Sequence, residues 1–185
     1  MNPMNNLIRH ITSLIFISLS LSAYPISYSF RGLSETNGLS DLTVSALYKD
    51  SVGYLWIGTA TSVECFDGFR FKHYPIFGDD EKLKWVNVIA ETQGNQILVG
   101  NDMGLWRINK ESGKLEPFVA EVIKFGVRSL LTDAQGTLYI GSEKGLFVCK
   151  NNELEQITIN ADMWSSDNFI VDLNMGEKDT LWILT

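Results

Sequence analysis

An apolar triplet followed by glycine recurs along the chain at a nearly constant interval, and this repeat limits the possible folds more than any other feature. The three glycines that follow the triplets are Gly58, Gly100 and Gly141. The steps between them are 100 − 58 = 42 and 141 − 100 = 41 residues, and after a further 43 residues Leu184 takes the place of the glycine. A constant period of roughly 20–50 residues indicates a repeat architecture.

Turn residues divide each repeat into four short strands. Asp50-x-x-Gly53 and Asp133-x-x-Gly136 carry the aspartate and glycine that type I turns prefer at their first and fourth positions. In the second repeat we place Glu91 and Gly94 at these positions, which leaves one extra residue before Gly100 and predicts a bulge there. No stretch beyond the N-terminus shows helical apolar periodicity over three turns, so we predict an all-β chain.

Four-stranded units at this interval are typical of β-propeller blades. The triplets are apolar on both strand faces, as expected where each blade lies between two others. We therefore predict an incomplete β-propeller of three four-stranded blades plus part of a fourth. A β-solenoid, whose coils are usually shorter, and a β-sandwich, which would repeat less regularly, are the alternatives. The repeats span about residues 39–80, 81–122, 123–163 and 164–185, within a partial propeller over 26–185.

The blade count implies that the propeller continues beyond this chain. A propeller needs at least about four blades, so we expect either the start of a longer protein or a truncated gene product. Residues 28–33 (YSFRGL) resemble the closing strand of a repeat and would complete the last blade of a closed ring.

The N-terminus has the order of a secretory signal peptide. Residues 1–10 contain Arg9 and no acid, residues 11–23 are apolar, and small residues follow. The apolar run is short for a membrane span, which needs about 20 residues, although an uncleaved anchor or an N-terminal helix remains an alternative. We predict a signal peptide over residues 1–25 and a periplasmic or extracytoplasmic location for the rest, without a lipid anchor because no cysteine lies near the cleavage region.

Composition excludes several classes of function. The net charge is −7, and a chain without a basic cluster is a poor nucleic-acid binder. The only cysteines are Cys65 and Cys149, too few for a zinc site of cysteines. They fall on the third strands of repeats one and three, one position out of phase. One blade should separate them by about 20 Å, beyond the roughly 7 Å limit for a disulfide, so we predict two free, buried thiols.

No motif for catalysis, cofactor binding or metal binding is present. His10 lies in the signal peptide, and His73 has no nucleophile beside it in the sequence. The acidic run Asp79-Asp80-Glu81 is expected to be a solvated loop rather than a calcium site. We predict that the chain has no kinase, phosphatase or hydrolase activity.

The tryptophans divide into core residues and one ligand-binding candidate. Because they lie in apolar strands, we expect Trp56, Trp106 and Trp182 to pack in the core. Trp164 lies in the polar segment MWSSDN and is the candidate for stacking on a sugar ring.

The first repeat resembles the two-component regulator propeller repeat. Residues 38–74 contain a valine-led strand, D-x-x-G, the run Leu55-Trp56-Ile57-Gly58-Thr59 and an aromatic-Asp-Gly turn. The likeness extends over about residues 28–185 and is strongest in the first repeat. Three features depart from the pattern, namely Ser62 where the family has glycine, Glu91 with Thr92 where it has the turn aspartate, and Leu184 where it has the glycine after the triplet.

This resemblance implies the extracytoplasmic sensor region of a membrane-spanning regulator whose cytoplasmic part is commonly a histidine kinase. It also implies an oligosaccharide as ligand. Expected partners are that ligand, the remaining blades of a longer chain and, in the full-length form, a second copy. The alternatives are a fragment of a secreted propeller lyase or glycosidase, and a nonfunctional truncated remnant.

Overall fold

The computed structural model describes residues 4, 27–76, 85–119, 123–159 and 169–185. The chain divides into two compact units, residues 1–32 and residues 33–185. In the first unit, residues 27–32 are irregular, so the closing strand predicted for residues 28–33 is not formed. The predicted signal peptide falls outside the described residues except for Met4. Among the described residues, no helix is both long and apolar enough to cross a membrane.

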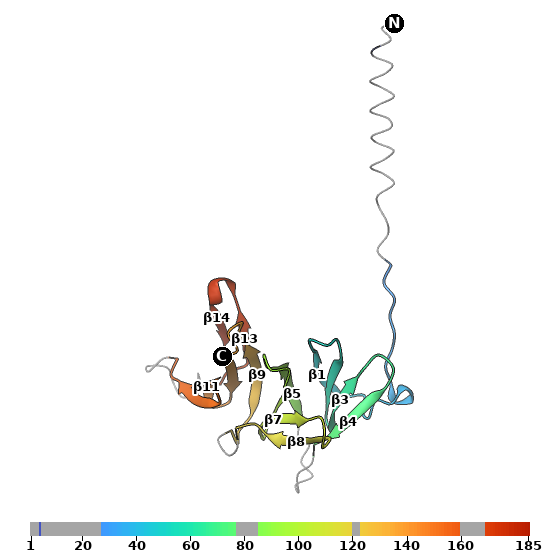
Figure 1. Ribbon diagram of the computed structural model, residues 1–185, viewed down its shortest axis with the longest axis horizontal. Helices are drawn as coiled ribbons and strands as arrows, with labels where there is room; N and C mark the ends of the chain where they lie inside the picture. Colours follow the sequence, from blue (N-terminus) through green and yellow to red (C-terminus); the bar gives the residue numbers. More distant parts are fainter. Residues whose placement is uncertain (1–3, 5–26, 77–84, 120–122, 160–168) are drawn as a thin grey trace. The chain divides into compact units, whose positions relative to one another are not determined.

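The second unit is built from antiparallel sheets in chain order, which confirms the all-β propeller prediction (Figure 1). We call the sheets blades 1 to 4. Blade 1 contains β1 (Val44–Lys49), β2 (Leu55–Thr59), β3 (Ser62–Phe66) and β4 (Phe71–Pro75). Blade 2 contains β5 (Val86–Glu91), β6 (Ile97–Asn101), β7 (Gly104–Asn109) and β8 (Lys114–Pro117). Blade 3 contains β9 (Val127–Thr132), β10 (Leu138–Ser142), β11 (Gly145–Lys150) and β12 (Glu153–Ile157). Blade 4 contains β13 (Asp172–Met175) and β14 (Leu181–Leu184). Two short 3-10 turns, η1 (Glu35–Asn37) and η3 (Glu177–Asp179), precede β1 and β14.

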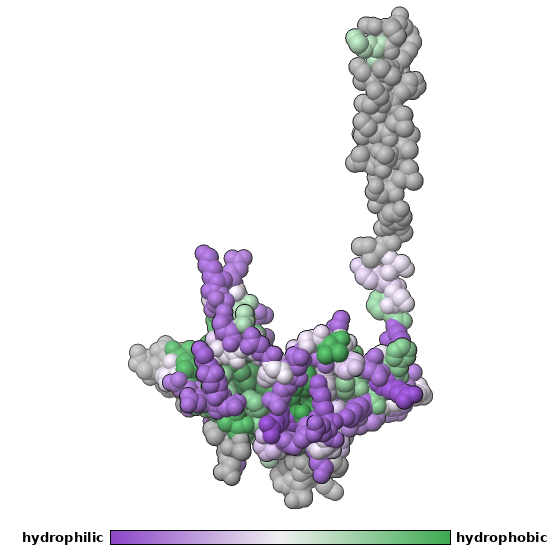
Figure 2. All heavy atoms as spheres, viewed as in Figure 1, coloured by the Kyte–Doolittle hydropathy of each residue, from purple (hydrophilic) through white to green (hydrophobic). Residues whose placement is uncertain are grey.

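The first strands of the blades lie side by side. β1 contacts β5, β5 contacts β9, and β9 contacts β13 (Figure 1). The polypeptide face seen in Figure 2 carries mostly hydrophilic side chains, with hydrophobic patches between them. Because a single four-stranded sheet cannot bury its own faces, the contacts between neighbouring blades place the core between the blades.

The turn in blade 2 is shifted by one residue from our sequence alignment. Glu91 pairs with Ile97 as Lys49 pairs with Leu55, so five residues form the turn in both blades. Thr92 is the residue that corresponds to Asp50, and Asn95, with φ of 58°, corresponds to Gly53. The alignment of Glu91 and Gly94 with the turn was therefore wrong. An asparagine that tolerates positive φ replaced the expected glycine.

The predicted bulge before Gly100 is also not found. The register shifts instead within β5, between Val86 and Val88, and the same shift occurs in β1 between Val44 and Ala46. The bulge is thus a feature of the repeat, located in the first strand. Val86 is therefore the residue of blade 2 that corresponds to Val44.

The glycine after each triplet receives a β-branched side chain from the next blade. A Cβ placed on Gly58 would lie 2.5 Å from Val86 Cγ1, and one on Gly100 would lie 2.7 Å from Val127 Cγ1. Gly141 faces Ile170 in the same way, at 2.7 Å. Val86, Val127 and Ile170 are all fully buried. Glycine is therefore required at these positions by close approach, not by backbone dihedral angle.

Three apolar clusters fill the spaces between successive blades. The first joins blades 1 and 2 and includes Trp56, Tyr74 and Val99. The second joins blades 2 and 3 and includes Leu98, Ile140 and Cys149. In the third, Ile170 and Leu173 pack with Leu146 of blade 3.

The cysteines lie in different clusters on the two sides of blade 2. Cys65 packs against the cluster between blades 1 and 2, whereas Cys149 belongs to the cluster between blades 2 and 3. Both thiols are free, as predicted. Cys149 is buried, but Cys65 is only half-buried, so the prediction that both are buried was wrong for Cys65. Cys65 borders a cleft, which is described below.

Candidate functional site

The third strand of blade 1 carries a carboxylate where the other blades carry an aromatic ring. Glu64 pairs with Ile57, the last residue of its triplet. The residues in the same place in blades 2 and 3 are Trp106 and Phe147. All three lie on the face that points away from the following blade. Glu64 is nevertheless fully buried, so its carboxyl oxygens need polar partners within the protein.

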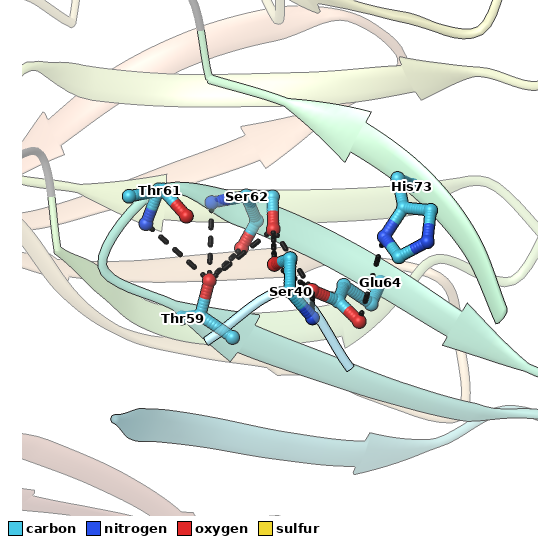
Figure 3. A network of polar contacts seen from close by, with 6 residues as sticks. All are labelled: Ser40, Thr59, Thr61, Ser62, Glu64 and His73. Atoms are coloured by element: carbon cyan, nitrogen blue, oxygen red, sulfur yellow. Dashed lines mark hydrogen bonds and ion pairs between the residues drawn. The ribbon is translucent and has the colours of Figure 1, made fainter. Parts of the chain in front are cut away.

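Hydroxyl and amide donors surround one oxygen of Glu64 (Figure 3). Glu64 Oε1 accepts hydrogen bonds from the backbone N–H of Ser40, 2.9 Å away, and from the hydroxyl groups of Ser40 and Ser62. Thr59 extends the network because its Oγ1 lies 3.2 Å from Ser62 Oγ and accepts the backbone N–H of Thr61. The segment before β1 is thereby attached to β3 through a buried carboxylate.

The other oxygen of Glu64 faces a histidine on the neighbouring strand. Glu64 Oε2 lies 3.6 Å from His73 Nδ1, and it has no hydrogen-bond partner within the described residues. His73 is partly exposed and stacks beside Phe71, with ring centroids 6.5 Å apart. The carboxylate lies between the serines and the histidine, so the order differs from a catalytic triad, in which histidine lies between serine and carboxylate.

The opposite face of blade 1 is organised by Asp50. Its Oδ1 accepts the backbone N–H groups of Val52, Gly53 and Tyr54, and its Oδ2 accepts the indole N–H of Trp56 at 2.8 Å. Burial alone raises the pKa of Asp50, but the hydrogen bonds from Trp56, Tyr54 and Gly53, with the charge of Lys110, outweigh it and lower the pKa below 3.8. The turn carboxylate thus remains ionised and holds the Trp56 ring in place.

A cleft of about 400 Å³ opens where the outer part of blade 1 meets blade 2. We call it the blade 1–2 cleft. The lining residues are Tyr54, Trp56, Cys65, Asp67, Arg70, Phe71, Lys72, Tyr74 and Lys110. Its volume falls within the range of about 300–1,000 Å³ that small-molecule sites occupy.

Cations and aromatic rings alternate around this cleft. Lys110 Nζ lies 5.8 Å from the ring centroid of Trp56, and Lys72 Nζ lies 5.1 Å from that of Tyr74. Lys72 Nζ also donates to the backbone oxygen of Lys110 at 2.9 Å, which connects blade 1 to the β7–β8 turn. Three cations and one acid, Asp67, line the cleft, so it is locally positive in a chain of net charge −7.

The acid and the thiol of the cleft have displaced pKa values. Backbone N–H groups of Arg70 and Phe69 donate to the carboxylate of Asp67 and lower its pKa. Burial raises the pKa of Cys65 to about 11, with a further contribution from the charge of Asp50. At neutral pH Asp67 is therefore ionised and Cys65 is a neutral thiol, which is a poor nucleophile.

The residues that the sequence singled out have different outcomes in the structure. Trp164, the predicted sugar-stacking residue, falls outside the described residues, as do His10 and the acidic run 79–81. Trp56 is buried as expected, and Trp106 is half-buried with its indole N–H donating to Asn101. Trp182 is 65% exposed, so its predicted place in the core was wrong. Leu181 and Ile183 point toward blade 3, and the alternation of the strand turns Trp182 to the other face.

Sequence reasoning missed most of the residues described above. Glu64 and Ser40 attracted no attention because they come together only when β3 and the segment before β1 are folded. The alternation Arg70-Phe71-Lys72-His73-Tyr74 was a visible signal for a cationic aromatic strand. Lys110 carried no signal, since it comes from the following repeat.

The comparisons with known proteins bear directly on blade 1. Residues 38–61 match the family model described as the two component regulator propeller. A histidine kinase, "Histidine kinase P4" of Formosa agariphila, is 36% identical over 59 residues, which are 32% of this chain and 4% of the kinase. The aligned part is thus a small fraction of that relative.

Solved structures share the fold at low identity. The extracellular domain of a putative hybrid two component system from B. thetaiotaomicron matches 80% of this chain with a TM-score of 0.65 and 19% identity. The match covers 21% of that chain. Virginiamycin B lyase from Staphylococcus aureus matches 76% of this chain and 48% of the lyase, with a TM-score of 0.57 and 12% identity. At these identities the likeness concerns the fold alone.

Strand order, repeat length and the matched segment agree with one another. The matched residues 38–61 include β1 and β2 of blade 1, with the turn, triplet and glycine on which the resemblance to the family rests. Residues 38–61 in the region of blade 1 are therefore similar to the two component regulator propeller repeat.

Proposed function

We propose that this chain is an extracytoplasmic sensing region of a two-component-type transmembrane regulator. The observation that carries this proposal is the match of residues 38–61 to the regulator propeller repeat, which the 36% identity to a histidine kinase supports. The extracellular domains of two component systems among the structural neighbours are consistent with this assignment. The chain spans about a fifth of such a domain, so output activity is proposed for the parent protein and not for these residues.

Export is the first part of the proposal that can be tested. Residues 1–185 and residues 33–185 would each be fused to alkaline phosphatase lacking its own signal peptide, because that enzyme is active only outside the cytoplasm. We expect activity from the longer fusion and none from the shorter one. An inactive longer fusion, produced at the same level, would contradict an extracytoplasmic location.

The second part concerns the ligand, for which we propose an oligosaccharide. Aromatic rings bordering the blade 1–2 cleft offer flat apolar surfaces of the kind that sugar rings stack on. A panel of oligosaccharides tested by thermal shift and calorimetry should contain at least one that raises the melting temperature in a saturable way. Release of cleaved sugar during the titration would favour the alternative of a secreted propeller lyase or glycosidase.

A further inference from the structure

We propose that the blade 1–2 cleft binds a small ligand that consists of a carboxylated ring, with the carboxylate held by Arg70, Lys72 and Lys110 and the ring against Tyr54 and Phe71. The inference deepens the proposed function, on which it rests only for the role of the ligand as a signal. The chemical class follows from the charge and the aromatic lining of the cleft.

The charge of the cleft favours an anion. Arg70, Lys72 and Lys110 are exposed. Lys72 Nζ uses one of its three N–H donors on the backbone oxygen of Lys110, which leaves two donors for a ligand. Asp67 is occupied by backbone N–H groups of its own turn, and Asp50 by the indole of Trp56. The lining residues alone give 3 − 1 = +2. Counting Asp50, which is not among them, gives +1, in contrast to the net charge of −7 for the whole chain. Charge-assisted hydrogen bonds to a carboxylate are the strongest contacts this lining can make.

The shape of the lining favours a ring. Trp56 and Tyr74 are buried and already lie beneath Lys110 and Lys72, so they form the floor. Tyr54 is 40% exposed and Phe71 is half-buried, and these two rings present accessible apolar surface at the sides. A small inorganic anion would leave that surface unused, whereas a ring bearing a carboxylate would cover it.

Two kinds of molecule share this chemistry, namely a uronate sugar and an aromatic acid. The probes are D-glucuronate and benzoate, and their neutral counterparts are D-glucose and benzamide. Each would be titrated by calorimetry into the purified protein. We expect saturable binding of at least one acid and no binding of its neutral counterpart. Whichever acid binds identifies the source of the ring.

Substitutions place the binding in the cleft. Lys110→Met and Arg70→Gln should each weaken binding of the acid about tenfold, the value of one charge-assisted hydrogen bond. Lys150→Met is the matched control, because Lys150 is an exposed lysine at the end of β11 in blade 3, and it should leave the affinity unchanged. Bound acid should also slow alkylation of Cys65, which borders the cleft, but not alkylation of Cys149.

Three outcomes would overturn the proposal: neither acid binds, the neutral counterparts bind equally well, or Lys150→Met weakens binding as much as Lys110→Met. The phosphatase fusions report export without reference to any ligand. Failure of carboxylate binding is therefore distinguishable from failure of the proposed sensing function.

Discussion

At the scale of single residues, the triplet glycines determine how closely successive blades approach. Gly100 is enclosed by Val127 of blade 3 and by Val88 of its own blade. Gly94 differs, because a Cβ there would meet only Thr92 Oγ1, at 3.9 Å. The pair therefore allows the cost of close approach to be separated from the general effect of replacing glycine by alanine.

We predict that Gly100→Ala destabilises the protein by about 1–3 kcal/mol, the usual cost of overpacking a core. Gly94→Ala should change the unfolding free energy by less than about 1 kcal/mol, since the added methyl group would meet Thr92 Oγ1 at an ordinary contact distance. Urea denaturation of both variants measures the difference. Equal midpoints would show that the blades can separate to accept a methyl group.

Asp50 gives blade 1 a defined response to acid. Its folded-state pKa is lowered, so the stabilisation is complete above its ordinary pKa of 3.8 and is lost as the pH falls through the lower folded value. We predict that Asp50→Asn lowers the unfolding free energy by about 2 kcal/mol at pH 7 and reduces the loss of stability below pH 3.8. Thermal unfolding between neutral and acid pH measures both effects.

A surface aspartate provides the control for this variant. Asp41 accepts one backbone N–H, from Thr43, at an exposed position. Asp41→Asn should change stability by less than Asp50→Asn at neutral pH. If the two variants behave alike, the four hydrogen bonds of Asp50 do not stabilise the turn.

At the scale of elements, the sequence predicted the strands and turns that recur in each repeat, and its predictions were wrong where one repeat differs from the others. The triplets and the Asp-x-x-Gly turns located blades 1 and 3 because those turns keep the residues that their dihedral angles favour. Blade 2 was misaligned because Thr92 and Asn95 perform the same roles with other side chains. Trp182 was misplaced because an apolar strand does not reveal whether a second sheet covers both of its faces.

The candidate site was less predictable than the blades for a physical reason. The blade 1–2 cleft combines β4 with a turn that lies about one repeat later, and the Glu64 network combines β3 with the segment before β1. Periodicity describes what blades share, while both sites depend on side chains, such as Glu64, that differ in chemistry from those at the same positions of the other blades.

The Glu64 network attaches the segment before β1 to blade 1. We predict that Glu64→Ala increases hydrogen exchange at the Ser40 amide at least about tenfold, because that N–H loses its acceptor. Glu64→Gln keeps a carbonyl oxygen in the same place and should preserve most of the protection. Mass spectrometry of a peptide covering residues 38–43 measures the exchange, and unchanged exchange in Glu64→Ala would contradict the attachment.

Blade 2 separates the two cysteines, and this leads to a prediction about thiol reactivity. We expect two free thiols in the denatured chain without prior reduction. In the folded chain, half-buried Cys65 should react before buried Cys149, although slowly at neutral pH because its pKa is raised to about 11. A Cys65–Cys149 disulfide found by non-reducing peptide mapping would contradict the blade assignment.

At the scale of the whole molecule, the described blades leave apolar side chains exposed on two sheet faces. Val44 and Leu47 of β1 correspond to Val86 and Ile89, which are buried in the next blade. On β14, Trp182 and Leu184 are exposed in the same manner. Exposed sheet faces of this kind promote association.

We predict that residues 26–185 alone are poorly soluble or oligomeric, whereas a complete propeller containing them is monodisperse. Replacing Leu47 and Trp182 together by lysine should reduce the association without lowering the melting temperature, since neither side chain is buried. Light scattering after size-exclusion chromatography measures the mass. A sharp monomer peak with cooperative melting from the unmodified fragment would contradict this expectation.

Glu64 also gives blade 1 a surface chemistry that differs from that of blades 2 and 3, although the three blades share the same strand arrangement. Blades 2 and 3 present Trp106 or Phe147 to the blade before them and could exchange places with little change in chemistry. Blade 1, moved into either place, would bring the carboxyl group of Glu64 against an apolar sheet and would separate it from Ser40. The side chain of Glu64 thus restricts the order of the blades. Recombination that exchanges blades 2 and 3 would be tolerated, whereas recombination that moves blade 1 would not.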